Sequence, residues 1–167
     1  MTSFKVGEGF AGLGVNAAHV NIVFGGRNGP VGTSWATALA TPSAGHTPFM
    51  VVVKPNVPVQ PPTLFVNKAT IDPDNEKHGR LTWGAAQAGI AAGIQQAVLH
   101  QILARDAYKD QVIIAAVWVN PNADDEEAVY ENNKVATVMA LTAAKDDLPT
   151  LRDTLDAGEP ENPYFRT

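Results

Sequence analysis

Residues 111–119 form the run Gln-Val-Ile-Ile-Ala-Ala-Val-Trp-Val, in which almost every side chain is apolar. Asn120-Pro121-Asn122 follow it directly and provide a stop signal. A short apolar run rich in β-branched residues is typical of a strand that is buried on both faces. We therefore expect a layered domain in which this strand is central and helices cover the sheet.

The other hydrophobic periods predict an alternation of strands and helices around this strand. Further strands are expected at 4–10, 19–24, 49–53 and 63–71, and helices at 30–40, 83–103, 124–144 and about 148–155. We expect the long helix to be capped by Thr82 after a charged loop at 72–80. This order predicts an α+β fold, with a mixed sheet covered by helices on one face. The prediction is a single domain over residues 1–158 and a C-terminal tail over 159–167.

Composition excludes several classes of function. The formal net charge of -5 argues against nucleic acid, because phosphate contacts need clustered basic residues. The longest apolar runs are too short to span a membrane, and no leader follows Met1, which predicts a cytoplasmic protein. The absence of cysteine excludes thiol nucleophiles and thiolate metal sites. Four scattered histidines without an H-E-x-x-H motif predict no metal site.

Gly7-Glu8-Gly9-Phe10-Ala11-Gly12 matches the dinucleotide-binding pattern G-x-G-x-x-G. That pattern binds a pyrophosphate only when its last glycine opens a helix. Here a second strand follows, so the match is interpreted as accidental. Gly7 and Gly9 instead indicate strand irregularities or a close approach of the backbone to another element.

Two strands carry polar side chains at every second position. His19 and Asn21 alternate with apolar residues, so their side chains share one face, and Lys68 and Thr70 repeat this arrangement. If the strands meet, an imidazole, an amide, an ammonium and a hydroxyl converge on a site for a small polar ligand. The alternative is that each set marks the solvated face of its strand.

Five blocks of the sequence resemble, in the same order, those of the formaldehyde-activating enzyme family. The resemblance covers all but the C-terminal tail, and the Asn-Lys-x-Thr-Ile block and the histidine strand are its most specific parts. The blocks are Val6-Gly7-Glu8, Ala18-His19-Val20-Asn21, Pro55-Asn56-Val57-Pro58, Thr63-Leu64-Phe65-Val66-Asn67-Lys68-Ala69-Thr70-Ile71 and Gly84-Ala85-Ala86-Gln87-Ala88-Gly89.

The resemblance implies a reaction and an assembly. The reaction is the condensation of formaldehyde with tetrahydromethanopterin, as co-substrate, in one-carbon metabolism, methylotrophy or formaldehyde detoxification. The implied fold is like the second domain of ribosomal protein S5, in a homopentamer with sites between subunits. His19 would be the proton donor. The substrate-binding residues would be Asn21, Met50, Lys68, Thr70 and Gln87. From its position alone, Gln87 is expected as a solvated residue in the first helical turn.

Asn21 departs from the resemblance, because the family has aspartate two residues after the histidine. An aspartate can hold an imidazole protonated, whereas an amide is neutral. Milder differences are Met50 in place of leucine and extra residues in the 72–80 loop. Two alternatives therefore stay open: a paralog that binds formaldehyde or a reduced pterin as a carrier or sensor, and a related lyase that acts on another one-carbon acceptor.

Overall fold

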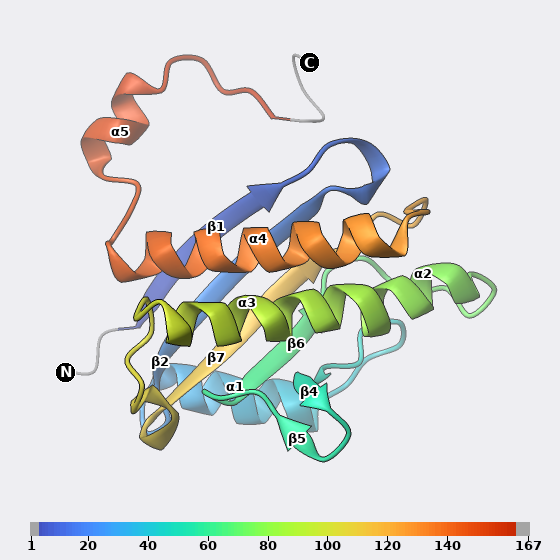
Figure 1. Ribbon diagram of the computed structural model, residues 1–167, viewed down its shortest axis with the longest axis horizontal. Helices are drawn as coiled ribbons and strands as arrows, with labels where there is room; N and C mark the ends of the chain where they lie inside the picture. Colours follow the sequence, from blue (N-terminus) through green and yellow to red (C-terminus); the bar gives the residue numbers. More distant parts are fainter. Residues whose placement is uncertain (1–3, 163–167) are drawn as a thin grey trace.

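A computed structural model of the protein describes residues 4–162 and contains a mixed five-stranded sheet (Figure 1). The strand order is β1-β2-β7-β6-β3, and β6 and β7 are parallel while the other neighbours are antiparallel. The central position of β7 and the α+β class are confirmed. The strands of this sheet are β1 (Lys5–Ala11), β2 (Ala18–Gly26), β3 (Phe49–Met50), β6 (Thr63–Asn67) and β7 (Gln111–Trp118).

Two long helices lie side by side over one face of the sheet: α3 (Gln87–Leu99) and α4 (Glu126–Lys145) (Figure 1). Apolar side chains such as Ile22, Ile90 and Ile113 are fully buried between the sheet and these helices. Helix α1 (Pro30–Ala40) packs on the opposite face, against β2 and β7. The shorter elements are the 3-10 turns η1 (Gly14–Asn16) and η3 (Ala107–Lys109), and α5 (Leu151–Asp156).

Gly7 and Gly9 of β1 face α4 at very short range. A Cβ at Gly7 would lie 1.9 Å from the Ala140 carbonyl oxygen, and a Cβ at Gly9 would lie 2.0 Å from that of Ala136. Only glycine fits at either position, because no L side chain tolerates a backbone atom at that distance. The expected close approach of the backbone is confirmed.

The long helix starts earlier than the sequence predicts. Helix α2 (Glu76–Arg80) continues through the π-helical turn η2 (Leu81–Ala86) into α3. Asn75 is the N-cap, because its side chain accepts a hydrogen bond of 3.0 Å from the His78 backbone N–H. The prediction of a loop over 72–80 with Thr82 as cap is therefore wrong, and Thr82 is buried inside the helix.

Two expected strands are shorter than predicted. The 49–53 run is interrupted at Val51, after which β4 (Val52–Lys54) turns away and pairs with β5 (Val57–Pro58). The 63–71 strand ends at Asn67, whose side-chain NH2 donates to the carbonyl oxygens of Gly45 and Ala69, at 2.7 and 2.9 Å. These bonds draw the chain out of the sheet, so the period-two alternation stops there.

Gly89 and Gly93 of α3 allow close packing against α4. A Cβ at Gly89 would lie 2.4 Å from the Tyr130 carbonyl oxygen, and one at Gly93 would lie 2.7 Å from the Thr137 Cβ. The close contact between the two helices therefore requires glycine at both positions. In the described part of the chain, no helix is both long enough and apolar enough to cross a bilayer.

Candidate functional site

His19 and Asn21 lie on the face of the sheet opposite α3 and α4. Their neighbours Ala18 and Val20 are fully buried on the helical side, so the alternation of β2 sends the two polar side chains the other way. His19 pairs in register with Trp118 of β7. Both polar residues border a cavity of about 250 Å³, which is lined by His19, Asn21, Lys68 and Trp118.

Lys68 reaches the same cavity from the end of β6. Its backbone N–H donates to the Val117 carbonyl oxygen over 2.8 Å, which continues the β6–β7 ladder one residue past Asn67. The side chain is exposed, and no carboxylate of residues 4–162 forms an ion pair with its ammonium. The structure therefore brings together an imidazole, an amide and an ammonium.

Glu8 is a neighbour of His19 that the sequence did not single out. Its Oε1 lies 3.1 Å from His19 Nε2, and the two side chains are 58% and 42% exposed. β1 pairs with β2 so that Glu8 stands opposite Asn21, and Phe10 contacts the imidazole edge-on with ring centroids 6.2 Å apart. The alternation of β1 could have identified Glu8 from the sequence. Gly7 and Gly9 face α4, so Glu8 between them faces the side of the sheet that carries His19.

Thr70 does not line the His19 cavity with Lys68, because the strand ends at Asn67 and its alternation does not reach Thr70. Its hydroxyl is 2.9 Å from His46 Nε2, and His46 Nδ1 is 2.9 Å from the Asn67 carbonyl oxygen. Because a carbonyl only accepts, His46 Nδ1 is the donor, and Nε2 can then accept from the Thr70 hydroxyl. Thr70 is thus held by the His46 imidazole.

Met50 and Gln87 line a second cavity, of about 450 Å³. Gln87 is only 8% exposed, and its Oε1 accepts a hydrogen bond of 2.6 Å from the Val52 backbone N–H. The expectation of a solvated residue in the first helical turn is wrong, because the helix already begins at Glu76. With the oxygen engaged, the side-chain NH2 is the group that Gln87 can offer to a ligand. The cavity is lined by Thr47, Phe49, Met50, Val52, Trp83 and Gln87.

The predicted site residues therefore do not form one cluster within a single chain. The His19 cavity and the Met50 cavity have no lining residue in common, and Thr70 lies at neither. In residues 4–162 no group of three or more histidine or acidic side chains is arranged to hold a metal ion. One cavity carries titratable side chains, and the other has an apolar wall with an amide.

Comparisons with known proteins agree on one family. The sequence model of the family described as formaldehyde-activating enzyme matches residues 6–164. A protein of Methanosarcina barkeri (strain Fusaro) named 5,6,7,8-tetrahydromethanopterin hydro-lyase is 36% identical over 160 residues, which cover 96% of this chain and 89% of that protein. A protein of Methanosphaera stadtmanae named bifunctional enzyme Fae/Hps is 35% identical over 152 residues, which cover 91% of this chain. The chain spans only 37% of the length of that bifunctional relative.

Proposed function

The chain belongs to the formaldehyde-activating enzyme family, and we propose that it is a hydro-lyase that condenses formaldehyde with tetrahydromethanopterin to methylene-tetrahydromethanopterin and water. The observation that carries this proposal is the meeting of His19, Asn21 and Lys68 at one cavity. These groups suit a reaction that moves protons on a small polar ligand. We further propose that residues 1–158 act as one domain, in the cytoplasm and without a metal.

The proposed chemistry assigns the proton transfer to His19. A pterin nitrogen adds to formaldehyde and gives a carbinolamine, whose hydroxyl is a poor leaving group. His19, as the imidazolium, protonates this hydroxyl as its C–O bond breaks, so that water leaves and an iminium remains. The second nitrogen then attacks the iminium carbon, loses its proton and closes the ring. Lys68 and Asn21 hydrogen-bond the polar edge of the pterin.

Glu8 is the proposed positioning residue for this step. Its carboxylate lies 3.1 Å from His19 Nε2. Nδ1 would then be the nitrogen that donates to the reacting hydroxyl. Asn21 stands opposite Glu8 in the β1–β2 register. The negative charge that the resemblance places two residues after the histidine would thus come from the adjacent strand.

Moving this carboxylate provides a test of the role of Glu8. We expect Glu8→Gln to lower kcat by about 10-fold, the lower end of the loss found when a group that orients a metal-bound histidine is removed. Adding Asn21→Asp should restore most of the lost kcat, because the charge returns to the same side of the imidazole. Steady-state kinetics of the two variants measure this. An unchanged kcat in Glu8→Gln, or no recovery in the double variant, would contradict the assignment.

The separation of the two cavities supports a site between subunits. We propose a homopentamer in which the His19 cavity of one subunit faces the Met50, Thr70 and Gln87 region of its neighbour. Exposed apolar side chains at Val53 and Val57, beside the Met50 cavity, favour such a contact. Light scattering on the purified chain should give a mass five times the 17.7 kDa of one chain. A monomer that is fully active would refute the shared site.

The activity itself is tested with formaldehyde and tetrahydromethanopterin. We expect the purified protein to form methylene-tetrahydromethanopterin faster than the uncatalysed reaction. If it binds the pterin tightly without accelerating the reaction, the enzyme proposal fails and the carrier or sensor alternative is supported. If it accelerates the reaction only with a different acceptor, the related-lyase alternative is supported.

A further inference from the structure

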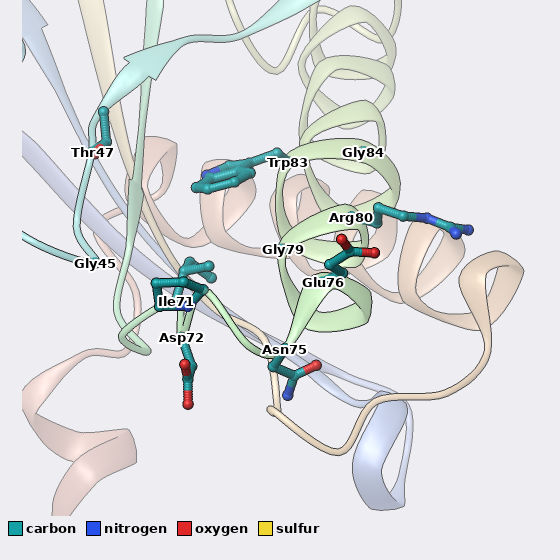
Figure 2. Close-up of a pocket in the computed structure, with 11 residues that line it drawn as sticks. Gly45, Thr47, Ile71, Asp72, Asn75, Glu76, Gly79, Arg80, Trp83 and Gly84 are labelled. Carbon is teal, nitrogen blue, oxygen red and sulfur yellow. The ribbon is translucent and has the colours of Figure 1, made fainter.

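Trp83 lies between two adjoining hollows of the surface. One is the Met50 cavity, and the other is a larger cavity of about 730 Å³ (Figure 2). Both are lined by Thr47 and by Trp83, so they adjoin along the indole and form one trough. Figure 2 shows the indole projecting from the helix towards the segment that carries Thr47. The trough therefore runs from Gln87, past Trp83, to Ile71 near the start of the helix.

The lining of the larger hollow is suited to a flat apolar group. Ile71, Pro73 and Gly79 contribute apolar surface beside the indole, and a Cβ at Gly79 would be only 3.6 Å from the Trp83 ring. The rim carries Asp72, Glu76 and Arg80, so its charges are mixed. Such a rim does not select an anion, and the apolar surface is the main attraction.

The indole of Trp83 is unusually open for so large an apolar side chain, with 47% of the residue exposed. It stands on the π-helical turn Leu81–Ala86, and interruptions of this kind inside α-helices are frequent at functional sites. Tryptophan offers a large rigid face on which an aromatic group can stack. A ligand that covers this face removes the exposed apolar surface of the indole from water, which stabilises the complex.

We propose that the trough binds the arylamine side chain of the reduced pterin, with its aromatic ring against Trp83. This inference rests on the proposed function, because it places the pterin ring between the His19 cavity of one subunit and the Met50 and Gln87 end of the trough in its neighbour. In tetrahydromethanopterin the arylamine is attached next to the pterin ring, so it enters the trough directly from that end. Cavities of about 300–1,000 Å³ are typical for ligands of this size. Trp83 is then a specificity-determining residue, which separates aryl-substituted pterins from simple ones.

The test compares two ligands on matched variants. Isothermal titration calorimetry with tetrahydromethanopterin should show a Kd about 10-fold or more higher for Trp83→Ala, and a much smaller change for Trp83→Phe, which keeps an aromatic face. The Kd of 6-methyltetrahydropterin, which lacks the arylamine, should rise much less in Trp83→Ala, because only the edge of the Met50 cavity is changed for that ligand. Leu99→Ala is the control, because Leu99 is an exposed apolar residue at the far end of α3.

Each other outcome overturns the inference. Equal losses for the two ligands would show that Trp83 supports the fold or the pterin ring, and unchanged affinity would show that it contacts neither. A lower oligomer mass of Trp83→Ala with unchanged affinity per assembled site would show that a second copy of the chain covers the indole. A wild-type protein that binds neither pterin would also refute it. If wild type binds tetrahydromethanopterin but does not accelerate the reaction, only the proposed function fails, and the same titrations still decide on Trp83.

Discussion

His19→Ala is expected to lower kcat for methylene-tetrahydromethanopterin formation by about 10²-fold or more, the usual effect of removing a general acid. The alanine variant lacks the imidazole that protonates the departing hydroxyl, so that step must rely on water or on the more weakly acidic Lys68 ammonium. The KM for the pterin should change much less, because Asn21 and Lys68 still line the cavity. Single-turnover and steady-state rates against the uncatalysed background measure the effect.

His100→Ala is the matched control for this variant. His100 is exposed at the C-terminal end of α3 and lines none of the cavities described above, so its loss should leave kcat unchanged. The His19→Ala protein should also keep its thermal stability, since His19 is partly exposed. A His19→Ala enzyme with the wild-type rate would remove His19 as the proton donor.

Gly9→Ala is expected to lower the free energy of unfolding by about 3 kcal/mol or more, at the upper end of the range for overpacked sites. The added methyl would lie 2.0 Å from the Ala136 carbonyl oxygen, so β1 and α4 must move apart. Helix α4 contacts β1 and β2 as well as α3, which spreads the displacement through the core. Urea denaturation, followed by circular dichroism, measures the loss.

Gly84→Ala serves as the control, because no atom lies within 4 Å of the Cβ it would add. Removing a helical glycine there should raise stability by up to about 1 kcal/mol. The two variants add the same methyl group, and they should shift the unfolding free energy in opposite directions. A Gly9→Ala protein as stable as wild type would mean that the contact between β1 and α4 relaxes without cost.

Elements whose signals are local in the sequence were predicted well. The apolar run of β7 is the central strand as expected, and α1 begins at Pro30 and ends at Ala40 as its proline and the following Thr41-Pro42 indicate. The helix from Glu76 was missed because part of its support is tertiary: the buried His78 forms a 3.0 Å hydrogen bond between its Nε2 and the Val119 carbonyl oxygen. No local period reveals such a bond.

In the candidate site, too, residues with a local sequence signal were predicted, and residues that depend on tertiary contacts were not. His19, Asn21 and Lys68 could be brought together from strand alternation, once β2 and β6 are known to flank β7. Thr70 was misplaced because the side chain of Asn67 ends the strand. Glu8 and Trp83 were not singled out, because their importance depends on strand register and on a helical turn that the sequence does not mark. The roles of these residues in binding and catalysis stay predictions.

Gly7 and Gly9 of β1 also fix the position of Glu8, which lies between them in the strand. A slip of β1 by two residues would put Lys5 or Ala11 where Gly7 or Gly9 now meets α4, and any Cβ there would collide with backbone. The packing of Gly7 and Gly9 against α4 therefore allows only one register of β1 on β2. This register also places the Glu8 carboxylate beside the His19 imidazole on the opposite face of the sheet. Mutations in the surface of α4 that packs on β1 should therefore lower kcat by displacing Glu8, although these residues do not contact the substrate.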